Sequence, residues 1–205
     1  MKNLGIDDLP RSMADPEVRA RRRAMLNQKH IAPLTKFAAK LRDRPGVEVP
    51  DFDPFDGGIN AQVLFLFEKP GPMTASGGGS GFISRDNDDP TAETTYGFMQ
   101  QAGIPRKMTV TWNIIPWWNG TRKVTAAELR EGVACVKELV SLLPKLEIVV
   151  LVGRKAARAS TYLGSIGLHI ITSDHPSPLV KANYPLRWHR IPKEWSKAVD
   201  GSSNC

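Results

Sequence analysis

Short continuous apolar runs alternate with longer amphipathic stretches along this chain. Four runs have the length of strands that are buried on both faces, and they cover residues 62–67, 108–112, 147–152 and 168–172. Stretches with helical spacing separate them. Because parallel strands are joined by right-handed helical crossovers, we predict an α/β fold, a three-layer α/β/α sandwich with a central four-stranded parallel sheet.

Capping signals place the helices of this pattern. Asp89 precedes a proline, which predicts a helix start between the first two strands. Thr125 and Glu128 have the spacing of a capping box, so the next helix is expected to continue to about Leu143. A short helix should follow the third strand, and an amphipathic helix over residues 192–199 ends the predicted fold.

The first 45 residues predict a basic, helical segment packed on the domain. Asp15, followed by a proline, caps a helix candidate that extends to about His30, and Pro33 restarts it. This segment holds eleven Lys and Arg against five Asp and Glu, a balance of +6 out of a net charge of +7. The arginines of residues 19–23 could contact phosphates or form a solvated helix face, and both interpretations stay open.

Length and composition limit the class of protein. A chain of 205 residues, 41% of them hydrophobic, fits one globular domain, which we place at residues 46–200. Residues 45–60 carry three prolines and predict an extended connector, and residues 201–205 predict a disordered tail. Two cysteines are too few for a four-thiolate metal site, and no apolar run approaches the ~20 residues of a membrane helix. We therefore expect a soluble cytoplasmic protein without metal or cofactor.

Three loops at the carboxyl ends of the predicted strands hold the candidate chemistry, because open α/β sheets bind ligands at that edge. The first strand is followed by Glu68-Lys69-Pro70-Gly71 and a glycine-rich run over residues 76–82. The second strand leads into Asn113, and the fourth into His175-Pro176-Ser177-Pro178-Leu179. Each feature alone has a structural explanation, such as a turn cap or a flexible loop. Their convergence on one edge favours a rigid pocket.

These motifs resemble those of the uracil-DNA glycosylase superfamily. There, a Gly-Gln-Asp-Pro-Tyr or Gly-Glu-Ala-Pro-Gly motif follows the first strand, an asparagine ends the second, and His-Pro-Ser-Pro-Leu follows the fourth. Residues 175–179 match the last motif at every position, and the order and spacing of all three motifs fit over residues 62–180. The basic N-terminal segment lies outside this match.

The resemblance implies an enzyme that flips a base out of the duplex into a pocket. It implies that Phe82 stacks on the base, that the Asn113 amide reads the pyrimidine edge, and that His175 donates a hydrogen bond to the departing base. For Phe82 the alternative is a loop anchor in the core. Among the tryptophans that flank Asn113, Trp112 is expected in the core, whereas Trp117 and its neighbour could line a DNA groove or cover the pocket.

The resemblance also implies contacts with the DNA around the base. Leu179 stands where the superfamily places the wedge that fills the vacated stack. Ser177 and nearby backbone amides are expected to grip flanking phosphates, and Pro178 of the same loop is expected to contact the DNA. Arg154, after the third strand, and Lys69 are further candidates for phosphate contact.

Lys69 departs from the family pattern, because the best-known members have at this position the aspartate that positions water. Glu68 matches the acidic position of the second form of the motif and is the candidate for orienting water next to an oxocarbenium-like transition state. Lys69 would instead contact a phosphate or pair with a surface acid. A lyase reaction through a Schiff base on Lys69 is a further alternative.

Gly71 is a second departure, since the strictest uracil-specific branch has a tyrosine there that excludes 5-substituted pyrimidines. With Pro70, it is expected to line the base pocket. Glycine leaves more space than tyrosine. We therefore expect substrates beyond uracil, such as ethenocytosine, hypoxanthine or xanthine.

The sequence thus predicts a monomeric DNA glycosylase that hydrolyses the N-glycosidic bond of uracil in DNA, releases the free base and starts base excision repair. Two alternatives stay open. A non-catalytic nucleic-acid-binding module on the same fold would bind DNA without releasing a base. A nucleoside or nucleotide hydrolase would act on free mononucleotides and ignore oligomers.

Overall fold

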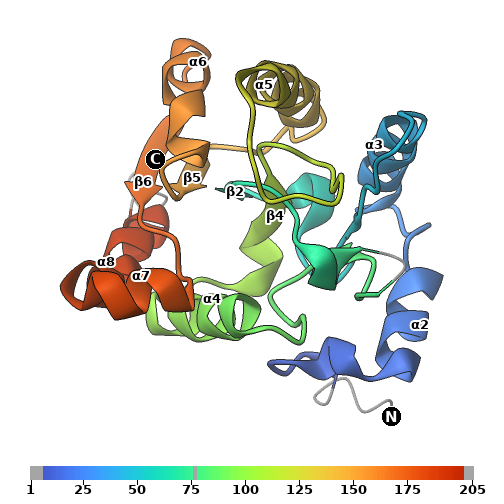
Figure 1. Ribbon diagram of the computed structural model, residues 1–205, viewed down its shortest axis with the longest axis horizontal. Coiled ribbons are helices and arrows are strands. Elements are labelled where there is room, and N and C mark those ends of the chain that lie inside the picture. The colour runs from blue at the N-terminus through green and yellow to red at the C-terminus, as the bar shows by residue number, and fades with distance from the viewer. Residues whose placement is uncertain (1–6, 76–77, 201–205) are drawn as a thin grey trace.

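The computed structural model describes residues 7–75 and 78–200. Its centre is a four-stranded sheet of order β4-β2-β5-β6, in which every neighbouring pair is parallel (Figure 1). The strands are β2 (Val63–Phe67), β4 (Thr109–Asn113), β5 (Ile148–Val152) and β6 (His169–Ser173). They lie where the four apolar runs predict them, within one residue at each end, and the predicted fold class is confirmed.

Helices cover both faces of this sheet. On one face lie α3 (Ala32–Arg42), α5 (Ala126–Ser141) and α6 (Ser160–Ser165), and on the other lie α4 (Pro90–Gln101) and α8 (Pro185–Asp200) (Figure 1). Because side chains alternate along a strand, Leu64 and Leu66 join the core under α5, whereas Phe65 joins the core under α8. Two cores on opposite faces make the three layers.

The described part of the N-terminal segment contains a short 3-10 turn, η1 (Ser12–Ala14), and helix α2 (Pro16–Ala24). Asp15 caps α2 as predicted and accepts a hydrogen bond of 2.8 Å from the Glu17 amide, but the helix ends at Ala24, before the predicted end. Helix α3 follows, with Pro33 in its first turn. Its apolar side chains lie in the same core as the sheet, so α3 is an integral part of the domain.

A buried ion network ties α2 to the rest of the fold. Arg22 is fully buried and ion-pairs with Asp53 and with Asp86, the latter at 2.6 Å. Arg106 ion-pairs with the same two carboxylates at 2.6 and 2.7 Å, and with Asp56 at 3.0 Å. Burial raises the pKa of Asp56 to about 7, whereas the two guanidinium groups outweigh burial at Asp53 and lower its pKa to about 2. Four distant chain segments therefore meet at one charged cluster.

Residues 45–60, predicted as an extended connector, also contain regular structure. Strand β1 (Asp51–Phe52) pairs in parallel with β3 (Phe82–Ile83). The short 3-10 turn η2 (Gly58–Asn60) follows β1 in the chain. The Phe52 ring stacks on Trp112 with 3.7 Å between centroids. The partner of β1 lies about thirty residues further along the chain, and such pairing has no local sequence signal. The hydrophobic pattern therefore did not predict β1.

The C-terminal helix corrects one prediction. The helix expected over residues 192–199 begins at Pro185, after the short α7 (Pro178–Asn183), and Pro192 lies inside it. Pro192 has no N–H group and cannot donate a backbone hydrogen bond within the helix. Ile191 and Trp195 are fully buried against the sheet, and this packing compensates for the missing bond. The tail predicted over residues 201–205 lies outside the described residues.

Short 3-10 turns complete the chain: η3 (Pro72–Thr74), η4 (Arg106–Met108) and η5 (Ala156–Ala159), the last of which leads into α6 where a short helix was expected. Within the described ranges, no helix is long and apolar enough to cross a membrane. The same residues contain no cluster of three or more histidine, cysteine, aspartate or glutamate side chains able to hold a metal ion.

Candidate active site

Asn113 is the last residue of β4 and lies beside Phe67, the last residue of β2, in the parallel register. Its side chain is buried, with 5% of the residue exposed, and among the described residues its Oδ1 atom has no hydrogen-bond partner. A buried polar atom without a partner costs about 1–3 kcal/mol. The amide is therefore poised to accept a hydrogen bond from a ligand at the carboxyl edge of the sheet.

His175 follows β6 and lies next to the same strand end. Its imidazole meets the Phe67 ring edge to face, with centroids 5.7 Å apart. Phe67 thus links the predicted Asn113 and His175, and sequence reasoning did not assign it a role. The only signal was its place as the last apolar residue before the first motif.

Burial lowers the pKa of His175, and Lys155 lowers it further, although the negative charges of Glu68 and Asp89 act in the opposite direction. Burial disfavours the charged imidazolium. The neutral imidazole is therefore the favoured form at physiological pH. It donates a hydrogen bond through its one N–H group and lacks the second proton that an imidazolium acid would transfer. The sequence alone did not establish this protonation state.

Glu68 follows β2, and its carboxylate is held by the loop that follows β5. Its Oε1 accepts a hydrogen bond of 3.0 Å from the Lys155 amide, and its Oε2 lies 3.6 Å from the Lys155 ammonium. A Cβ atom on Gly153, whose φ is +91°, would lie 2.8 Å from Oε1, so only glycine leaves room for this carboxylate. Glu68 remains partly exposed, which is compatible with the predicted contact to water.

Asp89 is a second carboxylate near the imidazole, and sequence reasoning treated it only as a helix cap. It does cap α4, because its Oδ1 accepts hydrogen bonds of 2.9 and 3.0 Å from the amides of Thr91 and Ala92. Its charge also acts on His175. Two acidic groups, Glu68 and Asp89, therefore act electrostatically on the imidazole of His175.

Lys69, a candidate for phosphate contact, is bound to protein groups in this structure. Its side chain is 4% exposed, and its ammonium donates to Asn119 Oδ1 and Glu128 Oε1 at 2.7 Å and to the Lys123 carbonyl at 3.0 Å. The alternative of pairing with an acid is the arrangement observed. Its ion pair with Glu128 would have to break before the nitrogen could attack a sugar carbon to form a Schiff base.

Phe82 is fully buried, which differs from the position expected of a base-stacking residue. Its ring packs among Met13, Val18 and Leu26 of the N-terminal segment. This is the loop-anchor alternative, and stacking on a base would require Met13 and Val18 to move. The glycine-rich run that precedes Phe82 lies partly outside the described residues, since Ser76 and Gly77 are not described.

The remaining loop residues differ in exposure. Pro70 is buried, and a Cβ atom on Gly71 would meet no atom within 4 Å, so the space expected at this position is present. Leu179 is 72% exposed at the start of α7. Ser177 caps that helix, since its hydroxyl accepts a hydrogen bond from the Val180 amide.

The other candidates for DNA contact remain predictions. Pro178 opens α7 and is exposed, and Arg154 is exposed beyond β5, so both are accessible to a ligand. Trp112 and Trp117 are buried, and the guanidinium of Arg44 lies 4.4 Å from the Trp117 ring. Trp117 therefore covers the core and does not line a groove.

The fold and the side chains described above define an open α/β protein with a candidate ligand site at the carboxyl edge of its parallel sheet. Residues 54–195 match the family described as the Uracil DNA glycosylase superfamily, and the chain belongs to this superfamily. No curated protein matches the chain.

Solved structures show similar folds. A solution structure of a proposed uracil DNA glycosylase from Methanosarcina acetivorans is 15% identical, covers 74% of this chain and 98% of its own, and has a TM-score of 0.50. The crystal structure of mimivirus uracil-DNA glycosylase is 17% identical, covers 89% of this chain and 74% of its own, and has a TM-score of 0.44. A variant of the mimivirus enzyme in complex with UGI is 19% identical, covers 89% and 75%, and also has a TM-score of 0.44.

Proposed function

We propose that this protein is a DNA glycosylase that hydrolyses the N-glycosidic bond between uracil and deoxyribose in DNA, acting as a monomer. The observation that carries the proposal is the buried, unpartnered oxygen of Asn113 beside the neutral imidazole of His175. An unpaired acceptor favours a base that presents a ring N–H, as uracil does at N3. The amide nitrogen can donate to the adjacent carbonyl of the same base.

The chemistry divides between three groups. The base leaves the stack and enters the site at the ends of β2 and β4. His175 donates a hydrogen bond to a base oxygen as the C–N bond breaks and negative charge develops on the leaving uracil. Glu68 orients the water that adds to the sugar cation, and the proton that this water loses passes through Glu68 to solvent, while the uracil anion takes up one proton from solvent. The products are free uracil and an abasic site.

The open space at Gly71 supports a wider range of bases. Ethenocytosine, hypoxanthine and xanthine are the further substrates that we propose. Leu179, the most exposed apolar side chain of its loop, would fill the space that the flipped base leaves in the duplex.

Alkaline cleavage of uracil-containing single- and double-stranded oligonucleotides tests the proposal. We expect strand breaks with the wild-type protein and a loss of at least about a hundredfold in single-turnover rate for Asn113→Ala and for His175→Ala. Asn27→Ala and His169→Ala, which remove the same side chains at exposed positions, serve as matched controls. Intact strands with the wild-type protein would disprove the proposal.

The same assay separates the two alternatives. A non-catalytic module would bind the oligonucleotides and release no base. A nucleoside or nucleotide hydrolase would release the base from free mononucleotides and leave the oligonucleotides unchanged.

A further inference from the structure

The arginines of α2 fall into two sets with different partners. Arg21 ion-pairs with Asp7 at 2.8 Å, and Arg22 ion-pairs with carboxylates of the buried ion network. Arg19 and Arg23 are bound instead to backbone oxygen atoms. Arg19 donates to the carbonyls of Met13 and Ala14 at 2.7 and 2.9 Å, and Arg23 donates to the Ser80 carbonyl at 3.2 Å.

Because carbonyl oxygens carry no net charge, the positive charges of Arg19 and Arg23 are not neutralised. Within the described part of the chain, neither residue forms an ion pair with an acidic side chain. The carbonyl contacts fix the position of each guanidinium group and leave its other N–H groups available. Two fixed cations on one helix face, four residues apart, are suited to a shared anion.

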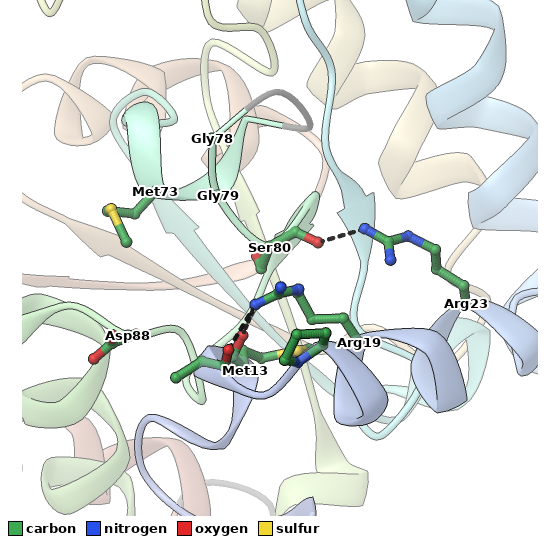
Figure 2. A pocket seen from close by; sticks show the side chains of 10 residues that line it. Met13, Arg19, Arg23, Met73, Gly78, Gly79, Ser80 and Asp88 are labelled. Carbon is green, nitrogen blue, oxygen red and sulfur yellow. Dashed lines mark hydrogen bonds between the residues drawn. The ribbon is translucent and has the colours of Figure 1, made fainter.

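Both arginines line a cavity of about 470 Å³ between α2 and the loop that ends at Ser80 (Figure 2). Met13 and Met73 form apolar parts of its wall. Asp88 also borders the cavity, but its carboxylate ion-pairs with Arg11 at 2.8 Å. The cavity therefore carries a net positive charge.

On the side of the cavity opposite α2, Gly79 and Ser80 are held against the preceding turn. The amides of Gly79 and Ser80 donate to the carbonyls of Ala75 and Met73 at 2.8 and 3.0 Å. A Cβ atom on Gly79 would lie 2.2 Å from the Met73 carbonyl oxygen, so this close approach requires glycine. Since these amides are already used, the guanidinium groups are the donors left for an anion.

The cavity adjoins the loop that the first motif begins. Met13 lines it and also packs on Phe82, and the guanidinium of Arg23 lies 5.9 Å from the centre of the Phe82 ring. We propose that this cavity binds a backbone phosphodiester of the DNA strand that carries the target base, held by Arg19 and Arg23. This inference rests on the proposed function for the identity of the ligand, because DNA supplies the phosphate.

Fluorescence anisotropy with a uracil-free DNA duplex, measured over a series of salt concentrations, tests the site without requiring catalysis. For the variant Arg19→Gln/Arg23→Gln we expect DNA binding to weaken by about tenfold to a hundredfold at low salt. A plot of the logarithm of the DNA-binding constant against the logarithm of salt concentration has a negative slope. The steepness of this slope should decrease by about 0.9, the value for one lost phosphate contact. Lys36→Gln/Lys145→Gln removes the same charge at exposed positions away from the cavity and should change both quantities less.

The single variant Arg23→Gln controls for a folding defect, because Arg23 is exposed and, among the described residues, donates a hydrogen bond only to the Ser80 carbonyl. DNA affinity and salt slope equal to those of the charge control, in a folded variant, would overturn the inference. A variant that loses affinity for inorganic phosphate while its DNA affinity is unchanged would overturn the assignment to DNA. If the variant loses DNA affinity but the wild-type protein releases no uracil, the phosphate site stands and the proposed glycosylase activity fails.

Discussion

Among single residues, His175 has the protonation state on which the proposed chemistry depends. Burial lowers its pKa, so we expect an imidazole midpoint below 6.5 and a single-turnover rate that is constant from about pH 7 to 8.5. Glu68→Gln removes a negative charge that raises this pKa, and should lower the midpoint further. NMR titration of the imidazole signals measures both values. A wild-type midpoint above 7 would contradict this expectation, because the charged imidazolium form would then predominate at pH 7.

Gly71 is the residue at which we expect base selection to be adjustable. Its φ is −108°, and a Cβ atom would contact nothing within 4 Å, so Gly71→Tyr should fold with a change in stability of about 0.5 kcal/mol or less. The larger side chain should restrict cleavage to uracil and abolish cleavage of ethenocytosine. Product analysis on a panel of modified oligonucleotides measures the range. An unchanged product profile would show that this position does not limit the pocket.

Some residues of the candidate site could be predicted from motif positions in the sequence, and others were found only because the fold brings them near the motif residues. Asn113 and His175 could be found because they stand at strand ends in a recognisable order. Phe67 and Asp89 could not, since their proximity to His175 depends on how β2 and α4 approach the loop after β6. The sequence also left the role of Lys69 open, because its three acceptors come from residues 50 to 59 positions away.

Among the elements, the ion pair between Lys69 and Glu128 joins the first-motif loop to α5. Glu128 is partly buried, which raises its pKa, but hydrogen bonds from Lys69 and Thr125 outweigh this effect and lower the value to about 2 from 4.5. The stabilisation is therefore complete above about pH 4.5 and is lost as the pH falls toward 2.

Glu128→Gln should remove this part of the acid sensitivity. Glutamine can still accept the capping hydrogen bond from the Thr125 amide, so α5 keeps its cap while the charge is lost. We expect the variant to be less stable than the wild type at pH 7 and to approach it near pH 2. Thermal unfolding followed by circular dichroism across this range measures the difference. A constant difference in stability at all pH values would contradict the assignment.

Element boundaries were predictable where a local signal marks them. Asp15, Asp89 and the capping box at Thr125 start helices where expected. The start of α8 was missed because its stability comes from burying Ile191 and Trp195, a contact that the sequence near Pro192 does not reveal. Strand β1 was missed because its partner β3 lies far along the chain.

For the whole molecule, the N-terminal segment is structural as well as basic. Leu34, Phe37 and Leu41 of α3 are buried in the main core, and each such side chain contributes about 1.5–3 kcal/mol. Deletion of residues 1–45 would also leave Asp53 and Asp86 without Arg22. Because a domain has only about 5–15 kcal/mol of net stability, we expect the truncated chain to be unfolded.

Circular dichroism and limited proteolysis of the truncated chain measure this outcome. Arg22→Met in the full-length chain is the finer test, because it removes the same ion pairs and should destabilise by about 3–5 kcal/mol. A truncated chain that folds and merely binds DNA more weakly would show that the segment is an accessory to an independent domain.

The central place of β2 in the sheet affects how the chain is made. Both neighbours of β2, β4 and β5, come later in the sequence, and β5 is complete only at Val152. During translation the apolar strand Val63–Phe67 leaves the ribosome before either neighbour exists. At ordinary rates of synthesis it waits for on the order of ten seconds before both sides are covered. A chaperone that binds short apolar segments would shield the nascent chain during this interval.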